Sequence, residues 1–239
     1  MTSILTINEI KYKDHNKNIE DLYDLISKEF DISRVRIWNK VKEFLVIEDD
    51  NKKLLDVGTG NSKNYIYAKN LGYDCIGTDI SNNLINIGIN KGLNIYKKDV
   101  LELKDTDFGK FNKIICIAVI HHLETIELQK IAIINMINCL YNNGELLLSV
   151  WSIEKQNILE YTVDSVFYEK NKNDYRDFIL GPNYVDWKYK QNIIKRFYYI
   201  HNYDTFNKMF MDLKELLPIS YTIYWEKQNW FCRIKLHNY

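Results

Sequence analysis

The chain has 239 residues, of which 46% are hydrophobic and 27% are charged, and this length is ample for one large hydrophobic core. Its 32 lysines and arginines balance its 32 aspartates and glutamates, which gives a formal net charge of +0 at pH 7. The balance excludes a global basic field that would attract nucleic acid, so any nucleic-acid site must be a local patch.

The cysteines and the hydropathy pattern further limit the class of protein. The four cysteines, Cys75, Cys116, Cys139 and Cys232, lie far apart in apolar surroundings and form no C-x-x-C pair, so neither a disulfide framework nor a zinc site is expected. The amino terminus lacks a signal-peptide pattern, and the longest apolar run, 114–120, is too short to span a bilayer. We therefore expect a cytoplasmic protein without a membrane segment.

The first forty residues divide into two parts. Residues 1–18 are polar and irregular, which predicts a flexible lead-in to a single domain over 19–239. A helix is expected from about residue 19, because Leu22, Leu25 and Ile26 repeat at helical spacing.

The stretch after this helix carries Arg34 and Arg36 close to Trp38. Guanidinium groups match carboxylates and phosphates, so these residues are candidates for an anion site. The alternative is a solvated helix face with Trp38 packed into the core, and position alone favours that alternative. A helix continues to about residue 46.

A buried strand over 53–57 ends in a tight glycine turn with Asp56, Gly58 and Gly60. Neither glycine carries a Cβ atom, so the backbone can turn sharply and approach a ligand closely. A turn at the carboxyl end of the first parallel strand is where open α/β sheets bind nucleotides. A helix from about residue 61 to 71 follows the turn.

A second strand, 74–79, ends at Asp79, about twenty residues after the glycine turn. This is the spacing at which a carboxylate reaches the two hydroxyls of a ribose; a helix cap is the alternative, for which Ser81 competes. A helix over 82–91 leads to a third strand, 93–97. Asp99 after it is a candidate to accept a hydrogen bond from an adenine amino group, or else a turn aspartate.

The next segments continue the alternation of strand and helix. A strand over 111–120, continuously apolar from Ile114 on, leads into His121 and His122, and such a run is typical of a buried parallel strand. A helix over 126–141 and a strand over 145–151 follow. Alternating strands and helices predict a parallel α/β sheet with right-handed crossovers.

The alternation of strand and helix stops at residue 152. We interpret residues 152–200 as an insert or lid over the pocket with helical parts. A helix over 205–217 and a hairpin of 220–225 with 230–235 end the chain. The insert is rich in aromatic and basic side chains: Tyr161, Phe167, Tyr168, Tyr175, Arg176, Phe178, Trp187, Tyr189, Arg196, Phe197, Tyr198 and Tyr199.

The chemistry of the strand ends limits the ligand. The turn has only two glycines, with Ser62 where a third would stand, and no Gly-Lys-Ser/Thr phosphate loop is present. Three acids at strand ends would repel a pyrophosphate. They suit a nucleoside that carries positive charge, and S-adenosylmethionine is such a ligand.

Several stretches carry a resemblance to known families: Asp56-x-Gly58-x-Gly60, Asp79 and Asp99, Tyr23 with Phe30-x-x-Ser33-Arg34-x-x-x-Trp38, 117–122, 150–154, Arg196-Phe197-Tyr198 and Asn229-Trp230. The chain resembles the class I S-adenosylmethionine-dependent methyltransferases. More narrowly, it resembles the eukaryotic tRNA methyltransferases that esterify 5-carboxymethyluridine at wobble position 34, a group that includes the methyltransferase domain fused to the AlkB-like tRNA hydroxylase.

This resemblance implies a Rossmann-like α/β fold with a mostly parallel seven-stranded sheet in the order 3-2-1-4-5-7-6, an antiparallel carboxyl-terminal hairpin and the lid insert. It also implies a tRNA anticodon loop as substrate and a small zinc-binding activator subunit, which would pair with the exposed edge strand 93–96. The cofactor-binding residues that we expect are Tyr23, Asp56, Gly58, Gly60, Asp79, Ile80, Asp99, Val100 and Ala118.

For the acceptor, Arg34 is the candidate to hold the carboxylate or a neighbouring phosphate. His121 or His122 would orient the acceptor, and Trp151 would stack on the base. Arg196 and Tyr198 would grip the anticodon loop from the lid. The alternatives are that the histidines bond backbone atoms and that Trp151 packs in the core.

The chain also departs from the family, which usually has Gly-Cys-Gly where this chain has Gly58-Thr59-Gly60, and often glycine at Ser62. The departure puts cofactor affinity in question. Two other functions therefore stand beside the first: methylation of a small-molecule acid, and a catalytically silent methyltransferase fold that serves as an RNA-binding or scaffold subunit.

Overall fold

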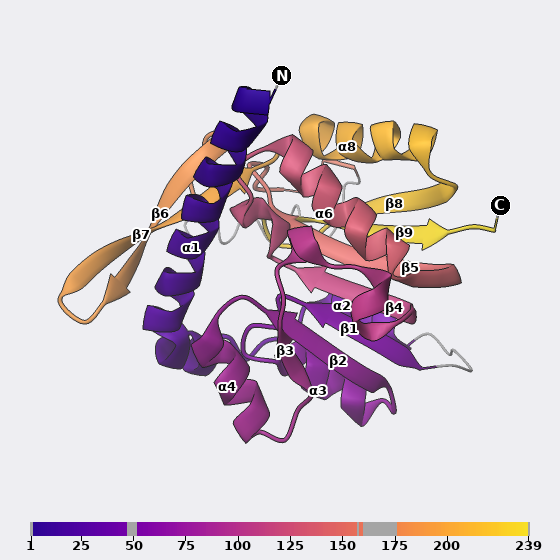
Figure 1. Cartoon of the computed structure of the whole chain (residues 1–239), viewed down its shortest axis with the longest axis horizontal. Coiled ribbons are helices and arrows are strands. Elements are labelled where there is room, and N and C mark those ends of the chain that lie inside the picture. Colours follow the sequence, from indigo (N-terminus) through magenta and orange to yellow (C-terminus); the bar gives the residue numbers. More distant parts are fainter. Residues whose placement is uncertain (1, 47–51, 157, 160–175, 239) are drawn as a thin grey trace.

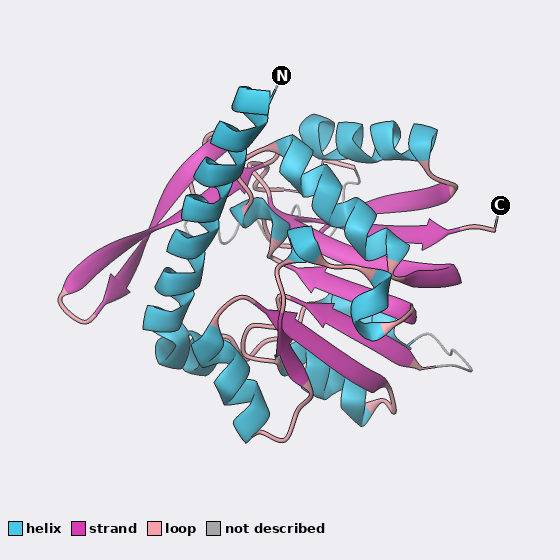
Figure 2. Ribbon diagram, viewed as in Figure 1, coloured by secondary structure: helices cyan, strands magenta, loops and turns pink. Residues whose placement is uncertain are grey.

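The computed structural model describes residues 2–46, 52–156, 158–159 and 176–238, arranged as a sheet with helices packed on its faces (Figures 1 and 2). The helices are α1 Thr2–Ser33, α2 Asn39–Val46, α3 Lys63–Asn70, α4 Asn82–Asn90, α5 Asp105–Phe108, α6 Ile126–Asn138 and α8 Tyr203–Leu216, with short 3₁₀ helices η1 Val100–Glu102 and η2 Ile120–His122. The strands are β1 Lys53–Val57, β2 Asp74–Asp79, β3 Ile95–Lys97, β4 Phe111–Ile117, β5 Leu140–Trp151, β6 Gly181–Tyr189, β7 Asn192–Ile200, β8 Ile219–Trp225 and β9 Asn229–Leu236.

Seven of these strands form one sheet in the order β3-β2-β1-β4-β5-β9-β8. The pairs from β3 to β5 are parallel, and β9 pairs antiparallel with both β5 and β8. With the carboxyl-terminal hairpin counted as strands six and seven, this is the predicted order 3-2-1-4-5-7-6, which is confirmed. Buried parallel strands are apolar on both faces, and Leu54 and Leu55 on β1 are both 0% exposed.

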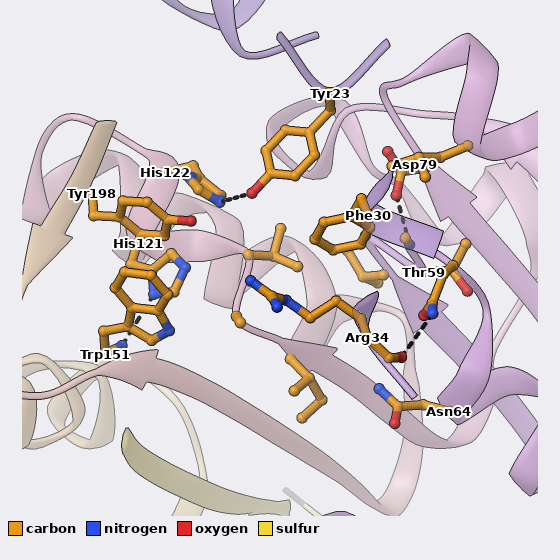
Figure 3. Close-up of a pocket in the computed structure, with 18 of the residues that line it drawn as sticks. Tyr23, Phe30, Arg34, Thr59, Asn64, Asp79, His121, His122, Trp151 and Tyr198 are labelled. Carbon is orange, nitrogen blue, oxygen red and sulfur yellow. Dashed lines mark hydrogen bonds between the residues drawn. The ribbon is translucent and has the colours of Figure 1, made fainter. Parts of the chain in front are cut away.

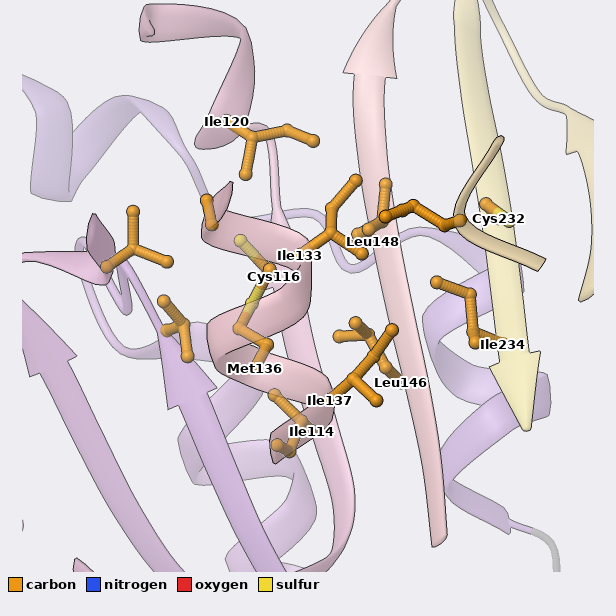
Figure 4. Close-up of a cluster of buried hydrophobic side chains, with 14 of the residues drawn as sticks. Ile114, Cys116, Ile120, Ile133, Met136, Ile137, Leu146, Leu148, Cys232 and Ile234 are labelled. Atoms are coloured by element: carbon orange, nitrogen blue, oxygen red, sulfur yellow. The ribbon is translucent and has the colours of Figure 1, made fainter. Parts of the chain in front are cut away.

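Two apolar clusters cover the faces of the sheet. One cluster packs α6 and α8 against β4, β5 and β9, and the other packs α2 and α3 against the opposite face. Figure 4 shows Ile133, Met136 and Ile137 of α6 beside Ile114 of β4 and Leu146 of β5. The same cluster contains Cys116, Cys139 and Cys232, and all four cysteines are free and buried, so here they act as small apolar side chains.

The first helix is longer than the sequence indicates, because α1 continues back to Thr2 through the segment 2–18 expected to be irregular. No glycine or proline interrupts the sequence before Ser33, so no residue type that breaks a helix is present. The helix crosses the carboxyl edge of the sheet between α4 and the β6–β7 hairpin (Figure 1). None of the described helices combines the length and the apolar character that a membrane span requires.

Long-range hydrogen bonds fix α1 in this place. His15 Nε2 lies 2.8 Å from the carbonyl oxygen of His122. The Asp24 carboxylate accepts hydrogen bonds from Ser81 Oγ at 2.6 Å and from the backbone N–H of Asn83 at 2.9 Å. Because Asp24 lies at the first turn of α4, its negative charge also favours the N-terminal end of that helix.

The described part of the insert is a two-stranded antiparallel hairpin, β6 with β7. Exposed and half-buried residues alternate along β6, which is the period of a strand and not of a helix. The helical parts that we expected are therefore absent from 176–200. Four aromatic residues of the insert, Tyr161, Phe167, Tyr168 and Tyr175, lie outside the described residues.

The strand β5 begins at Leu140, earlier than the predicted start at residue 145, and α6 ends at Asn138. The register between β4 and β5 shifts between Phe111 and Lys113. Asn143 has a positive φ of 63°, so the residues between the expected helix and the expected strand form an irregular stretch of β5, where the register with β4 shifts.

Candidate active site

A cavity of about 640 Å³ opens at the carboxyl ends of β1, β2 and β4. Every residue that the sequence predicted for the site lines this cavity except Asp56. Figure 3 shows that these side chains come from opposite directions, with Asp79 and Thr59 on one side and His121, Trp151 and Tyr198 on the other. The volume lies in the range of pockets for cofactors and small molecules.

The glycine turn forms one wall of the cavity. Gly58 and Gly60 have φ values of 65° and 55°, the left-handed region that favours glycine. A Cβ atom at Gly58 would lie 2.4 Å from Cγ2 of Val119, and one at Gly60 would lie 3.1 Å from Cε1 of Phe30. Gly58 therefore excludes a side chain for steric as well as conformational reasons, whereas at Gly60 the backbone conformation is the main obstacle and the Phe30 ring would have to shift only slightly.

Asp79 lies at the end of β2, beside this turn. Its carboxylate accepts a hydrogen bond from the backbone N–H of Gly60 at 2.8 Å and another from that of Ser81 at 3.0 Å. Burial raises the pKa of Asp79, and these backbone hydrogen bonds oppose the rise. Ser81 Oγ accepts from the N–H of Leu84 and caps α4, so the carboxylate is left at the cavity wall.

Asp56 does not line the cavity, although the sequence predicted it as a cofactor-binding residue. Its side chain is 1% exposed, and Oδ2 accepts a hydrogen bond from the Thr59 hydroxyl at 2.8 Å. Burial raises its pKa to about 7. Asp56 therefore holds the glycine turn from behind, and Thr59 stands between it and the cavity.

The third acid, Asp99, lines the cavity and accepts a hydrogen bond from the N–H of Leu101 at 3.0 Å, which caps η1. Ile80 and Val100 follow the second and third strands and add apolar surface to the same wall. Ala118, at the end of β4, has a φ of 60°. This left-handed backbone is uncommon for a residue with a Cβ atom and turns the chain toward the histidine pair.

The side chains of His121 and His122 are hydrogen-bonded to other residues of the chain. Nδ1 of His122 lies 2.8 Å from the Phe197 carbonyl, which can only accept, so Nδ1 carries the proton and Nε2 accepts from the Tyr23 hydroxyl at 2.9 Å. His121 Nδ1 accepts from the N–H of Trp151 at 3.0 Å. Burial lowers the pKa of His122 to about 4 and holds that of His121 well below 6.5, so both rings are neutral at neutral pH.

Trp151 and Tyr198 form an aromatic stack beside the histidines. Their ring centroids lie 4.0 Å apart with planes 7° from parallel. Phe178 also stacks on Trp151 at 5.4 Å. Tyr198 is 2% exposed, and burial raises its pKa well above the usual value, so its hydroxyl remains protonated.

Three arginines line this end of the cavity: Arg34 after α1, Arg176 in the insert and Arg196 on β7. Arg196 is 1% exposed, and its Nε atom has no hydrogen-bond partner among the described residues. No ion pair within 4.0 Å joins any of the three to a carboxylate in the described part of the chain. Burial, together with the charge of Arg196, lowers the pKa of Arg34 and of Arg176.

The sequence missed several residues that line the cavity, among them Lys63, Asn64 and Arg176. Lys63 and Asn64 directly follow the glycine turn, so their position was a signal, but no local pattern distinguishes them from solvated helix residues. Arg176 is held by Gln228 of the β8–β9 turn, which accepts from its N–H at 3.0 Å and donates to its carbonyl at 2.6 Å. That contact joins residues far apart in the sequence.

Residues 31–207 match the family model described as a methyltransferase domain. The chain belongs to this family. It is 33% identical over 159 residues to the tRNA (carboxymethyluridine(34)-5-O)-methyltransferase of Arabidopsis thaliana, across 65% of this chain and 37% of that protein. It is 32% identical over 157 residues to the Xenopus tropicalis protein of the same name, alkbh8, across 66% of this chain and 23% of that protein. The chain thus spans well under two thirds of the length of either relative.

Solved structures show the same fold at low identity. The structure titled "DhpI-SAH complex structure" superposes with a TM-score of 0.66 at 9% identity, covering 94% of this chain and 98% of that one. An S-adenosylmethionine-dependent methyltransferase from Clostridium acetobutylicum superposes with a TM-score of 0.59 at 13% identity, covering 91% of this chain and 100% of that one. The methyltransferase domain therefore has the Rossmann-like fold of S-adenosylmethionine-dependent enzymes.

The cavity fits S-adenosylmethionine by the chemistry of its donors and acceptors. The Asp79 carboxylate is an acceptor for ribose hydroxyls beside a glycine turn that leaves room for the ligand. Asn64 has a buried Oδ1 atom without a hydrogen-bond partner among the described residues, which suits an ammonium group. Lys63, the neighbour of Asn64 in the chain, is a cation in the same part of the cavity. Burial and the charge of Arg34 lower the pKa of Lys63.

Proposed function

We propose that this methyltransferase transfers a methyl group from S-adenosylmethionine to the carboxylate of 5-carboxymethyluridine at position 34 of tRNA, giving the methyl ester. The relatives named above support the substrate. The observation that carries the proposal is the group of Arg34, Arg176 and Arg196, which lines the cavity without a carboxylate partner in the described residues. Arg196 is buried and Arg34 is half-buried, and cations withdrawn from water in this way require an anion, which the acceptor supplies.

In this proposal Asp79 would accept hydrogen bonds from the ribose, and Asp99 would face the adenine. Gly58 and Gly60 would let the backbone approach the methionine end. The apolar contacts would come from Tyr23, Ile80, Val100 and Ala118. Asp56 would act from behind the turn and not as a ligand contact, because Thr59 separates it from the cavity.

The reaction needs positioning more than proton transfer. When bound, the cofactor supplies an electrophilic methyl group on a sulfonium. A carboxylate with a pKa of about 4 is already ionised at neutral pH, so no general base is needed. Arg34 and Arg196 would hold the carboxylate so that one oxygen lies about 3 Å from the methyl carbon. Tyr198 would donate a hydrogen bond, because its hydroxyl stays protonated.

The histidines would act as positioning groups in this scheme. His121 holds the end of β5 through the Trp151 N–H, and His122 holds Tyr23 of α1, so neither ring has a basic nitrogen free for the acceptor. Trp151 already stacks on Tyr198 and Phe178, and it would serve as a platform for the base once Phe178 yields. Such stacking is typical of single-stranded RNA recognition.

A small activator subunit belongs to the same proposal. The strand β3 is the free edge of the sheet, as the sequence predicted, but it comprises only Ile95–Lys97. Leu93 precedes the strand and is 7% exposed, whereas Tyr96 is 47% exposed. A pairing partner would therefore contact Tyr96 and the open backbone of β3.

The test is mass spectrometry of nucleosides from carboxymethyluridine-bearing tRNA after incubation with the chain and S-adenosylmethionine, with and without the activator subunit. We expect the methyl ester to form. If the chain binds the cofactor but forms no ester, the acceptor is wrong, and small acids become the next substrates to examine. If it does not bind the cofactor, the chain serves as a silent scaffold.

A further inference from the structure

The β6–β7 hairpin is a basic arm on a chain without net charge. Residues 181–200 contain four basic side chains and one acid, Asp186, whereas the whole chain has 32 residues of each sign. The turn of the hairpin projects away from the central sheet, on the far side of α1 (Figure 1). On a neutral protein a nucleic-acid site must be a local patch of positive charge, and the hairpin is such a patch.

The register of the two strands brings three lysines together at the outer end of the hairpin. Lys188 pairs with Ile193, Lys195 pairs with Asp186, and Lys190 lies in the turn. Paired residues lie on the same face of a two-stranded sheet, and so do residues two apart on one strand. Lys188 and Lys195 therefore share one face, and all three lysines are exposed.

These lysines have little compensating charge in the described part of the chain. None of the three forms an ion pair with a described carboxylate. Asp186 faces Lys195 across the strands and offsets about one charge, and Nζ of Lys190 lies 5.1 Å from the ring centroid of Tyr189, which does not neutralise it. Solvated protein surfaces usually mix both signs of charge, so this excess of lysine indicates an anionic partner.

The same face also carries an exposed aromatic ring. Tyr184 is 68% exposed and lies two residues before Asp186 on β6, so its side chain shares the face of Lys188 and Lys195. Surfaces that bind single-stranded nucleic acid combine cations for the phosphates with aromatic rings on which bases stack. The pairing of charge with an aromatic ring favours RNA over an acidic protein as the partner.

The hairpin connects this face to the cavity. Arg196 directly follows Lys195 on β7, and because side chains alternate along a strand, Arg196 is buried and lines the cavity whereas Lys195 is exposed. From Arg196 to Asn192, where β7 begins, the strand extends about 13 Å at about 3.3 Å per residue. An RNA with one base in the cavity can therefore lay its neighbouring nucleotides along the hairpin.

We propose that the outer face of the β6–β7 hairpin is an RNA-docking surface, on which Lys188, Lys190 and Lys195 contact backbone phosphates and Tyr184 stacks on an unpaired base. The identity of this RNA as a tRNA anticodon loop rests on the proposed function. The docking surface itself is tested without methyl transfer, because its contacts do not involve the reacting groups.

The first test measures how RNA binding depends on salt. A fluorescein-labelled anticodon stem-loop with an unmodified uridine at the wobble position is titrated with the chain and S-adenosylhomocysteine at several KCl concentrations. Each phosphate contact contributes about 0.7–0.9 to the slope of log K against log salt. In the triple variant Lys188→Gln, Lys190→Gln, Lys195→Gln we expect this slope to fall in magnitude by about 2–3. An unchanged slope overturns the inference.

The matched control removes three exposed lysines near the amino ends of the strands, away from the cavity: Lys53, Lys69 and Lys235. Their replacement by glutamine should leave the slope unchanged, and an equal fall in slope would show that total charge and not the hairpin binds the RNA. Calorimetric affinity for S-adenosylhomocysteine reports that each variant is folded.

Two single variants separate charge from stacking. Tyr184→Ser should weaken RNA binding about fivefold or more without changing the salt slope, because stacking releases no counterions; unchanged affinity refutes the stacking contact. Asp186→Asn removes the acid on this face and should tighten RNA binding, a gain that misfolding cannot produce. Weaker binding in Asp186→Asn contradicts the role assigned to the lysines.

Further outcomes separate this inference from the proposed function. If the triple variant loses the salt slope but the wild type forms no methyl ester on carboxymethyluridine-bearing tRNA, the hairpin docks RNA and the acceptor is another group. If the ester forms with the same KM in the wild type and the triple variant, the proposed function stands and the docking surface is wrong. The inference is also wrong if the triple substitution abolishes a dimer in sedimentation while RNA binding is unchanged, because the face then joins two copies of the chain.

Discussion

Replacing Ser62 by glycine is expected to stabilise this protein. Ser62 is the N-cap residue of α3, with a φ of 64° and a ψ of 18°, in the left-handed region where residues with a Cβ atom are strained. Its side chain is 0% exposed, and Oγ has no hydrogen-bond partner among the described residues. The serine therefore adds backbone strain and a buried unpaired hydroxyl at the start of the helix.

The size of the effect follows from these two features. A left-handed backbone costs a residue with a Cβ atom about 1–2 kcal/mol, and a buried unpaired hydroxyl costs about 1–3 kcal/mol. Against this, glycine gains conformational entropy in the unfolded chain, which costs about 0.4–1 kcal/mol. We expect Ser62→Gly to raise the free energy of unfolding by about 1–4.5 kcal/mol, or about 2–4 °C in Tm for each kcal/mol in a chain of this length.

The assay is urea unfolding of the wild type, Ser62→Gly and Ser62→Ala. Alanine removes the hydroxyl but keeps the Cβ atom, so it should recover only the hydroxyl part of the gain. The difference between the two variants then measures the backbone strain. A midpoint for Ser62→Gly at or below that of the wild type would refute the reasoning, because it would mean that neither the strain nor the unpaired hydroxyl is costly.

Three further predictions concern the site and its pH dependence. Asp79→Ala should weaken S-adenosylmethionine binding at least about 100-fold, because two charge-assisted hydrogen bonds are each worth about 1.5–3 kcal/mol; a calorimetric affinity within threefold of wild type would contradict this. Arg34→Ala should abolish methyl transfer while cofactor binding is spared, and unchanged turnover would remove the assigned role. His201 is 0% exposed, and burial lowers its pKa to about 4, whereas the unfolded value is about 6.5. Between these two pH values the unfolded chain thus binds more protons than the folded chain. The free energy of unfolding should therefore be highest above pH 6.5 and should fall by up to about 3 kcal/mol as the pH drops toward 4. Urea midpoints from pH 7 to 4.5 should show a shallower decline in His201→Asn, and an equally steep decline would argue against this assignment.

The sequence by itself determined the alternation of strands and helices and the cofactor edge, whereas the strand order followed from the resemblance to the methyltransferase family. Apolar runs, the turn at Gly58 and Gly60, and the position of Asp79 are local patterns, since each depends on residues that are neighbours along the chain. Parallel strands end at one edge, so the patterns also place these residues together. This is why nearly all predicted residues line one cavity.

Other features depended on contacts that sequence patterns do not encode. Asp56 and Asp79 both lie near the carboxyl ends of buried strands, yet only the packing of Thr59 shows that Asp56 is shielded from the cavity. The insert formed a hairpin because its alternating residues pair across β6 and β7, whereas its aromatic and charged composition gave no clear period.

Only the tertiary structure decided what the cavity presents to an acceptor. Arg34 is separated from Arg176 and Arg196 by a long stretch of chain, and each of the three has an ordinary solvated interpretation in its local sequence. The three guanidinium groups come together at one end of the cavity only when the loop after α1, the insert and the hairpin meet above the sheet. Burial and long-range contacts are properties of the packed chain, so this group of arginines is readable only from the fold.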